Sequence, residues 1–531
     1  MPRPTLGSVV RTLLGLALPL ATVPLTACPP ENTAGDASRA NANLGDAGFR
    51  EVDATLPSGD LVWLTAGGGA HDDRCLSSVA TGDGTIVALC ASESQGGAIW
   101  GAGSDNEVEV TSVGGADLVL LGLDPATGAI RWHKTVASGG NESAGIARMT
   151  SLADGRVAAL IQVGGPITGD GINLPTALDR DLVLLVMTAA GAVEDVLTIA
   201  RGDFLTNILG WQLSARSSGG LIVSGRFGTS LTVLPGSAGE TLLVPNPNGP
   251  TAPDFTAFLL FLNASLDLDR VRTLGGPGES VNARAVESAS GRLLLVGSFD
   301  PSFTLGHTAT QVLVDDDGLG AAFVAKLDAN DEPLWAISFG SAGGDYARNV
   351  VETADGGVVT TGFYGQGVSA ATMHVPGLGG VVLPGAVGNQ FQLFVLALSS
   401  TGVPRWLRGF TAEGSATGWT VGALDNNDVV VSGTASFGSD ILRQGRFSDG
   451  EVVTLRDPTS LLVRYRGDDG SRVWTRLTGP AGGFGATVRP DGSVVQYGQY
   501  YWPAMYAEGE PNQTEPPYLG LADGVVGLYA P

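Results

Sequence analysis

One stretch of the chain contains every phrase of a repeat that runs through most of the sequence. Residues 321–357 read AAFVAKLDANDEPLWAISFGSAGGDYARNVVETADGG. The largely apolar run Ala322–Leu327 is followed by a short turn and a Trp phrase, Leu334–Gly340. The pair Asp355-Gly356 then lies between two β-rich runs and suits a hairpin turn, because these residues tolerate positive φ. The repeat therefore predicts four short consecutive strands in each unit.

The Trp phrase recurs at a regular distance. Trp63, Trp132, Trp335, Trp406 and Trp474 are separated by 69, 203, 71 and 68 residues. Because 203 is close to three times 68, two further copies are expected near residues 200 and 270. They are found with the Trp replaced, at Asp195–Arg201 and Arg270–Gly276. The sequence therefore contains seven copies.

Two other phrases keep the same period. Hairpin-type turns lie at Asp83-Gly84, Asp154-Gly155, Ser218-Gly219, Ser290-Gly291, Asp355-Gly356, Asn426-Asn427 and Asp491-Gly492. Apolar runs begin at Asp117, Asp181, Phe255, Ala322, Gln392, Ser460 and Gly524. Four strands in each of seven units of about 68 residues are what a β-propeller requires. We therefore predict an all-β fold, a seven-bladed β-propeller over residues 61–531.

The two ends of this region predict how the ring closes. Residues 61–66 form a Trp strand with no preceding partner, and the unit that runs to Pro531 lacks its Trp strand. Pairing the two removes two exposed sheet edges. We predict that the N-terminal strand closes the last blade.

The composition limits the classes of function. Asp and Glu number 53 against 29 Lys and Arg, giving a net charge of −24, which argues against a nucleic-acid partner. The motifs GxSxG, HExxH, CxxC and the P-loop are absent. A non-enzymatic binding module is therefore favoured and no cofactor is expected. A quinoprotein- or lyase-like enzyme with its site in the central channel stays open as an alternative.

The first residues have the features of an export signal. Thr12–Leu25 is mostly apolar, follows Arg3 and Arg11, and is too short for a comfortable membrane span. Leu25-Thr26-Ala27-Cys28 resembles a bacterial lipobox. The resemblance implies that residues 1–27 are a signal peptide and that Cys28 carries lipid at the bacterial envelope. Pro29 favours the outer membrane, and the anchor is the only membrane contact expected.

Residues 28–60 are predicted to be a disordered tether, because they are rich in Ala, Asn, Asp and Gly and lack periodicity. The other two cysteines, Cys75 and Cys90, lie symmetrically about Gly82-Asp83. That symmetry places the two sulfurs opposite each other on a hairpin. An exported chain meets oxidising conditions, so we predict a disulfide between them.

Residues 321–345 resemble the repeats of secreted bacterial β-propellers (SBBP-like repeats), and weaker matches cover residues 61–531. The matching features are a Gly-Gly…Asp opening, an Asp-Gly turn, the strand AFVAKLD and a following Trp. Residues 123–132, LDPATGAIRW, look instead like the repeats of quinoprotein-type propellers and of the outer-membrane assembly lipoprotein scaffold. Both resemblances imply a propeller, but a fold does not fix a function.

Long connections are expected between the second and third strands. They span roughly residues 93–116, 164–180, 228–254, 300–320, 365–391, 436–459 and 501–520. In a propeller these open on the same face as the blade-to-blade connections, and loops on a rigid scaffold commonly bind ligands. We predict that this long-loop face binds a protein or a glycan, with an outer-membrane assembly scaffold as the alternative. Drift in the length of unselected loops would explain the same pattern.

Two sets of residues are candidate sites. Tyr500, Tyr501, Trp502 and Tyr506 form an aromatic cluster in the last long connection. They are predicted to stack on a ligand, or alternatively to pack the closing blade. Asp73 and Asp345 each lie ten residues before a turn Asp and are candidate Ca²⁺ ligands, or alternatively solvated acids.

Overall fold

The computed structural model describes most of the chain from Gly59 onward. The described residues are 59–93, 97–113, 115–138, 140, 147–202, 209–228, 230–244, 256–275, 280–306, 310–315, 319–367, 372–378, 383, 390–437, 442–506, 513–517 and 519–531. The predicted signal peptide, Cys28 and nearly all of the predicted tether lie outside them. Among the described residues, no helix is long and apolar enough to cross a membrane.

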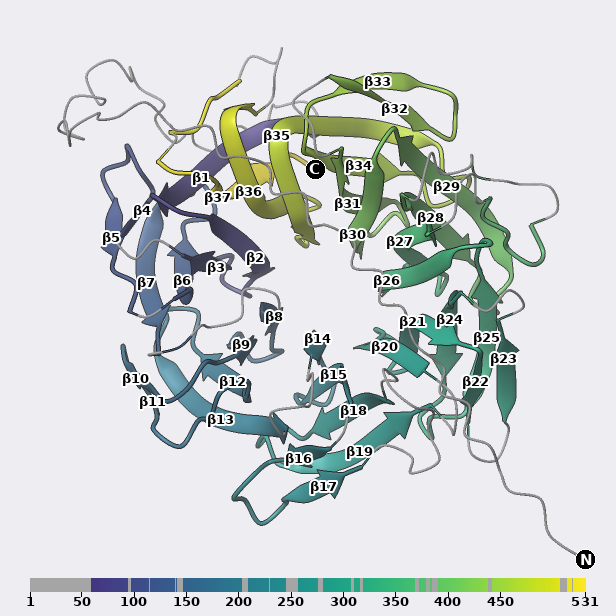
Figure 1. Cartoon of the computed structure of the whole chain (residues 1–531), viewed down its shortest axis with the longest axis horizontal. Coiled ribbons are helices and arrows are strands. Elements are labelled where there is room, and N and C mark those ends of the chain that lie inside the picture. Colours follow the sequence, from purple (N-terminus) through teal and green to yellow (C-terminus); the bar gives the residue numbers. More distant parts are fainter. Residues whose placement is uncertain are drawn as a thin grey trace, which may run out of the picture. The chain divides into compact units, whose positions relative to one another are not determined.

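The described chain is all-β and its strands form a β-propeller arrangement around a central axis (Figure 1). The strands nearest the axis are β2 (Asp73–Ala80), β8 (Ala147–Ser151), β14 (Leu209–Ala215), β20 (Ser280–Glu287), β26 (Gly344–Glu352), β30 (Ser415–Ala423) and the second half of β35 (Arg472–Val488). The second strands are β3 (Ile86–Ser92), β9 (Val157–Gln162), β15 (Leu221–Phe227), β21 (Leu293–Asp300), β27 (Val358–Gln366), β31 (Val429–Ser436) and β36 (Val494–Met505).

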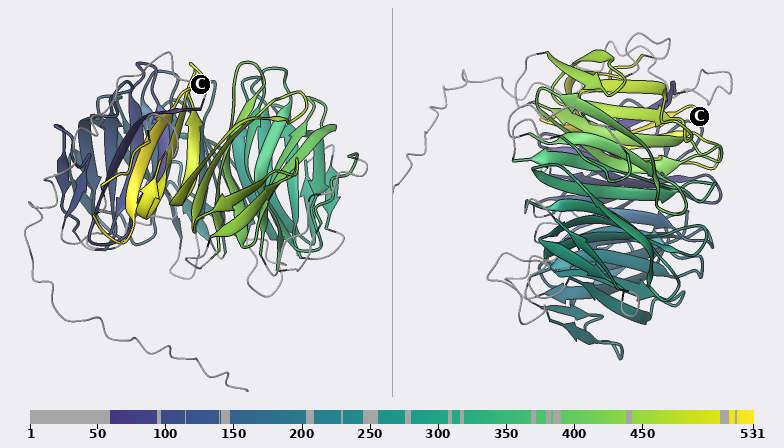
Figure 2. Two further views of the ribbon diagram at one scale, coloured as in Figure 1. Left: turned by 90° about the horizontal axis from the view of Figure 1, so that it is seen from above. Right: turned by 90° about the vertical axis from the view of Figure 1, so that its right-hand side faces the viewer.

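The third and outermost strands complete the units. The third strands are β6 (Asp117–Leu123), β12 (Leu182–Met187), β18 (Thr256–Leu262), β24 (Ala321–Leu327), β28 (Gln392–Leu398), β34 (Thr459–Tyr465) and β37 (Asp523–Tyr529). The outermost strands are β7 (Ile130–Val136), β13 (Val193–Gly202), β19 (Leu268–Leu274), β25 (Pro333–Phe339), β29 (Pro404–Ala412), the first half of β35, and β1 (Leu61–Gly69). All neighbouring strands pair antiparallel and run between the two faces of the ring (Figure 2).

Five sheets contain one four-stranded unit each, for example β20-β21-β24-β25. A nine-stranded sheet, in the order β30-β31-β34-β35-β36-β37-β1-β4-β5, holds the other strands of the repeat together with β4 and β5. The sheet is continuous because β35 pairs with β34 through its first half and with β36 through its second half. The third strands are the apolar runs of the sequence, and β6, β24, β28 and β37 are buried along their whole length.

The predicted hairpin turns join the first two strands of each unit. Their second residue has the positive φ that the sequence suggested, for example 86° at Gly84 and 77° at Gly356. Asn427 adopts the same conformation, with φ 69°. Asn occupies this left-handed region at a lower steric cost than most other residues that carry a Cβ.

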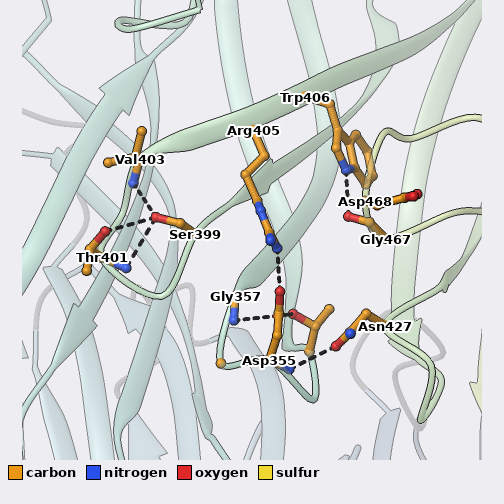
Figure 3. A network of polar contacts seen from close by, with 12 residues as sticks. Asp355, Gly357, Ser399, Thr401, Val403, Arg405, Trp406, Asn427, Gly467 and Asp468 are labelled. Carbon is orange, nitrogen blue, oxygen red and sulfur yellow. Dashed lines mark hydrogen bonds and ion pairs between the residues drawn. The ribbon is translucent and has the colours of Figure 1, made fainter.

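Each repeated Trp packs on the next unit (Figure 3). The Trp406 indole donates to the Gly467 carbonyl at 3.0 Å, in the turn that precedes the outermost strand of the neighbouring unit. In this turn Gly470 has φ +69°, and a Cβ there would lie 2.6 Å from the Trp406 ring. Only glycine therefore combines this backbone with the indole contact.

The same contact is present at the other repeated Trp residues. Trp63 lies against Gly128, Trp132 against Gly191, Trp335 against Gly402 and Trp474 against Gly59. Where the Trp is replaced, the positive-φ residue is not glycine: it is Leu266 or Asp331. Arg270, which occupies the Trp position, donates to Asp331 at 2.9 Å instead.

The N-terminal strand pairs with the last strand of the chain, as predicted. β1 runs antiparallel to β37 from Leu61 opposite Tyr529 to Gly67 opposite Gly524. The ordered ring begins two residues before the predicted boundary at residue 61. Asp60 is only 2% exposed and forms an ion pair with Arg476 at 2.6 Å, and Gly59 donates its N–H to Ala530.

Candidate functional site

The predicted disulfide is present. Cys75 on β2 and Cys90 on β3 are directly paired across the hairpin, and their sulfurs are bonded at 2.10 Å. Both residues are fully buried between the first unit and the closing strands. The bridge therefore links the two strands nearest the axis in the unit beside the closure.

Asp73 and Asp345 occupy equivalent places and make equivalent hydrogen bonds. The Asp73 carboxylate accepts from the Gly69 and Glu93 backbone N–H groups at 2.7 and 3.1 Å. The Asp345 carboxylate accepts from the Ser341 and Gly365 N–H groups at 2.6 and 2.9 Å. Both side chains are almost completely buried. Neither carboxylate is therefore exposed to solvent. Each one instead holds the backbone of the connection that leads into its unit through these hydrogen bonds.

The predicted Ca²⁺ ligands do not lie in a ligand cluster. Asp73 and Asp345 belong to different units, and the described residues contain no group of three or more His, Cys, Asp or Glu side chains that could hold a metal ion. A calcium ion requires six or more oxygen ligands. The geometry of these two carboxylates supports a structural role.

The predicted aromatic patch is divided between core and surface. Tyr500 and Tyr506 are 1% and 3% exposed, and their rings meet edge to face at 6.5 Å. The Tyr500 hydroxyl donates to the Pro517 carbonyl. These two side chains pack in the closing unit, which favours the alternative of core packing over stacking on a ligand. Tyr501 is half-buried, and the Trp502 side chain lies outside the described part of the structure.

The long connections contain two-stranded hairpins that the sequence analysis did not identify. They are β4 (Ala98–Trp100) with β5 (Val108–Val110), β10 (Ile167–Gly169) with β11 (Ile172–Leu174), β16 (Leu231–Val233) with β17 (Thr241–Leu243), β22 (Ser302–Leu305) with β23 (Gln311–Val314), and β32 (Arg443–Phe447) with β33 (Val452–Leu455). Three of them extend an outermost strand, because β4 pairs with β1, β16 with β13 and β32 with β29. They therefore cover edges that would otherwise be open to another chain.

Exposed aliphatic side chains are concentrated on these long connections. They hold ten of the fourteen large exposed hydrophobic residues of the described chain, among them Leu242 at 63% and Val312 at 57%. The ten are Val113, Leu178, Leu242, Val244, Val312, Val314, Leu319, Leu442, Val452 and Leu519, and Leu521 directly follows the last connection. Large exposed apolar groups on the connections of one face are available for contact with another protein.

A groove of about 310 Å³ lies between two of these connections and the blade-to-blade connection at residues 340–342. Val314 and Asp315 line it from the β22–β23 connection, and Thr372 and His374 from the next long connection. The backbones of Gly340 and His374 form a β-bridge, with N···O distances of 3.1 and 2.6 Å. The groove is therefore built from ordered backbone at the junction of two units.

A second, larger cavity of about 550 Å³ lies on the axis of the ring. Every strand nearest the axis contributes to it, through residues such as Ser77, Arg148, Gln212, Arg284 and Asn349. Trp419, Phe484 and Tyr497 supply an aromatic wall. A cavity of this size accommodates a small organic molecule.

Sequence reasoning missed the axial cavity although its signal was present. The residue six positions before the first residue of each hairpin turn lies on the strand nearest the axis. In two of the repeats this residue is an arginine, Arg148 or Arg284. His, Lys and Cys, the usual markers of a site, are scarce in this sequence, and the net charge of −24 gives no indication of a local group of arginines.

The sequence matches no protein-family model and no curated protein, so membership of the secreted repeat family stays a prediction. Similar solved structures include the polysaccharide lyase Uly1, with 9% identity, a TM-score of 0.39, and 78% of this chain and 85% of the lyase covered. They also include the Dos1 propeller, with 10% identity, a TM-score of 0.29, and coverage of 91% and 94%. The V. cholerae biofilm matrix protein Bap1 has 8% identity, a TM-score of 0.27 and coverage of 90% of each chain. At these scores the likenesses carry no argument about function.

Proposed function

We propose that this protein is a lipid-anchored, non-enzymatic binding module of the bacterial envelope that holds a partner protein on its long connections. One observation carries the proposal: the exposed aliphatic side chains gather on those connections. Aliphatic surface gains free energy when another protein covers it. Sugar recognition relies more on exposed aromatic rings, and two of the four candidate tyrosine and tryptophan residues are buried. A protein is therefore favoured over a glycan.

The proposed ring has seven blades. The nine-stranded sheet divides at β35 into two four-stranded units, β30-β31-β34-β35 and β35-β36-β37-β1, which join the five separate units. The first and last of the strands nearest the axis are also neighbours, because the Thr487 hydroxyl on β35 donates to the Ser78 carbonyl on β2 at 2.8 Å. A seven-bladed ring gives the long connections a rigid base.

The proposed anchor is a lipid on Cys28, and it rests on the lipobox resemblance alone. Changing Cys28 to Ser should move the protein from the membrane fraction to the soluble fraction and abolish incorporation of a labelled fatty acid. A Cys28→Ser protein that stays in the membrane fraction and keeps the label would contradict the anchor.

The partner is tested by site-specific photocrosslinking in cells of the native host. A photoreactive amino acid at position 242 or 312 should crosslink to the same partner protein, identified by mass spectrometry. Position 403 is the matched control, because Val403 is also 59% exposed but lies outside the long connections, and it should give no such product. Leu242→Glu and Val312→Glu together should abolish recovery of the partner with the folded protein. No crosslink at either position, together with glycan binding that Trp502→Ala removes, would replace the protein partner by a glycan.

A further inference from the structure

We infer that the axial cavity binds a small ligand that carries two or more oxyanion groups (carboxylate, sulfate or phosphate), held by Arg148, Arg284 and Arg348. This site is separate from the long connections, and it does not depend on the proposed protein partner. Guanidinium groups pair with planar oxyanions through two parallel hydrogen bonds, which makes arginine the usual residue for such ligands.

The three arginines come from three of the strands nearest the axis, β8, β20 and β26. Arg148 on β8 and Arg284 on β20 line the cavity. Arg348 on β26 lies next to Asn349, which also lines it, and its guanidinium sits 4.1 Å from the centre of the Trp419 ring. Arg284 donates to the Arg348 carbonyl at 2.8 Å, so the strands that carry these two side chains are fixed against each other.

Their positive charge is concentrated within the channel. Neither Arg148 nor Arg348 forms an ion pair with an acid among the residues that the structure describes. Burial, followed by repulsion from Arg284, lowers the pKa of Arg148 to about 10. The same two causes lower the pKa of Arg348 to about 9. The nearby groups that favour the charged forms are the phenols of Tyr497 and Tyr346.

Like charges gathered in a partly desolvated channel are unfavourable until an anion neutralises them. The chain is acidic overall, with a net charge of −24, yet no acid among the described residues forms an ion pair with Arg148 or Arg348. Other arginines do pair with acids, since Arg405 pairs with Asp355 at 2.6 Å and Arg476 pairs with Asp60 at 2.6 Å. Arg148 and Arg348 are therefore available to an anion from outside the chain.

A β-bulge presents Arg348, whereas Arg148 and Arg284 lie in regular strand pairings. The register shifts by one residue at Arg348, Trp419 and Phe484 on the neighbouring strands β26, β30 and β35. The shift recurs at the equivalent positions 76 of β2 and 211 of β14. A bulge redirects one side chain and is frequent beside functional sites. Trp419 and Phe484 meet edge to face at 6.2 Å, so the bulged residues form one continuous wall of a cation and two aromatic rings.

The position of the cavity indicates the face from which the ligand enters. Its lining includes Ala80, Ala423 and Pro490, and each of these residues lies within a few positions of a hairpin turn. The cavity therefore opens toward the face with the tight turns, opposite the long connections. Its volume of about 550 Å³ suits one small polyanion or the charged end of a longer ligand.

Isothermal titration calorimetry of the full-length protein at low ionic strength tests the inference. Citrate, inorganic sulfate and inorganic phosphate are the probes, and glucose is the neutral control. At least one anion should bind with 1:1 stoichiometry, glucose should not bind, and added salt should weaken the complex. Tighter binding of citrate identifies a carboxylate ligand, and tighter binding of sulfate or phosphate identifies a tetrahedral oxyanion.

Variants place the binding in the channel. Arg148→Gln and Arg348→Gln should each weaken the anion at least tenfold, whereas Arg405→Gln at the rim should leave the affinity unchanged. Arg148→Lys keeps the charge and should lose less affinity than Arg148→Gln, which separates loss of charge from loss of fold. Binding that also perturbs the fluorescence of the wild-type protein but not that of Trp419→Phe would support the same site. Absence of 1:1 binding by all three anions, or equal affinity in Arg148→Gln and the wild type, would overturn the inference.

Discussion

The outer rim and the central channel of the ring use their charged and aromatic residues in opposite ways. At the rim, one arrangement recurs: a Trp such as Trp406 rests on a positive-φ glycine, and arginines such as Arg405 pair with acids. In the channel, equivalent positions differ from unit to unit. The residue six places before each turn is Ser77, Arg148, Gln212, Arg284, Asn349, Thr420 or Gly485. The rim keeps the Trp–Gly contact at five seams, because each of these seams solves the same packing problem, and it departs from it only at Asp195 and Arg270. The channel departs from the repeat where a ligand site needs unlike groups side by side.

The largest expected effect tests the rim as a source of stability. Trp406→Ala removes a side chain that is 4% exposed and packs in the core between two units. We expect the free energy of unfolding to fall by about 3–5 kcal/mol, measured by urea denaturation. Arg270→Ala, at a position where the Trp is replaced and an ion pair stands in its place, should cost only about 1 kcal/mol. If both variants lost the same free energy of unfolding, the Trp–Gly contact would not be more stabilising than the Arg270–Asp331 ion pair that replaces it.

A smaller effect is expected from the glycine of the same seam. Gly470→Ala places a Cβ 2.6 Å from the Trp406 ring at φ +69°. The strained backbone and the displaced indole should together cost about 2 kcal/mol. Adding Trp406→Ala should make the Gly470→Ala change less costly, since the clash is removed. Urea denaturation of the single and double variants measures this coupling, and strictly additive losses would exclude it.

Asp523, a buried carboxyl on the closing strand β37, predicts that the free energy of unfolding rises as the pH falls. Burial, with a contribution from the neighbouring Asp73, raises the pKa of Asp523 to about 6. The folded state then holds this proton more tightly than the unfolded state, so the free energy of unfolding should rise by about 1–3 kcal/mol as the pH falls from 7.5 to 5. Asp523→Asn should flatten this rise.

Asp355, in the turn between β26 and β27, pairs with Arg405 on the outermost strand and provides the contrast. Hydrogen bonds from Thr353 and Arg405 lower its pKa to about 2, so its contribution is complete above about pH 4 and is lost only in stronger acid. Asp355→Asn should therefore leave the slope between pH 5 and 7.5 unchanged. Urea denaturation at pH 5 and 7.5 measures the free energy of unfolding of both variants. If Asp355→Asn reduced its pH dependence as much as Asp523→Asn does, Asp523 would not be the group responsible.

The smallest expected effect is a gain. Arg148→Met removes one of the like charges in the channel and keeps much of the apolar stem. We expect the free energy of unfolding without ligand to increase by about 1 kcal/mol, which thermal denaturation without added anions detects as a higher midpoint. A loss comparable to that of Trp406→Ala would show that Arg148 serves the fold, as the rim residues do.

The sequence predicted most of the scaffold because periodicity reports packing that is repeated. The turn at Asp355-Gly356, the buried run Ala322–Leu327 and the pairing of residues 61–66 with the last strand were all found from spacing alone. The Cys75–Cys90 bridge followed from symmetry about a turn.

The candidate sites were harder to predict because they depend on burial and on residues brought together from different units. The aromatic spacing around Tyr500 and Tyr506 did not distinguish a stacking surface from the core of the closing unit. Arg148, Arg284 and Arg348 are far apart in sequence and lie together only in the ring. The β-bulge at Arg348 shifts the register by one residue. An alternating sequence pattern does not reveal such a shift.

The pairing of β1 with β37 sets an order of events during biosynthesis. Leu61–Gly69 emerges from the ribosome first among the ordered strands, yet its partner Asp523–Tyr529 is made last. Until then, the earliest strand has an unsatisfied edge and the Trp474 ring has no Gly59 backbone to rest on. Contacts between such distant residues form slowly. A chain that is cut short remains an open arc with exposed edges, which makes it prone to aggregate and easy for proteases to recognise.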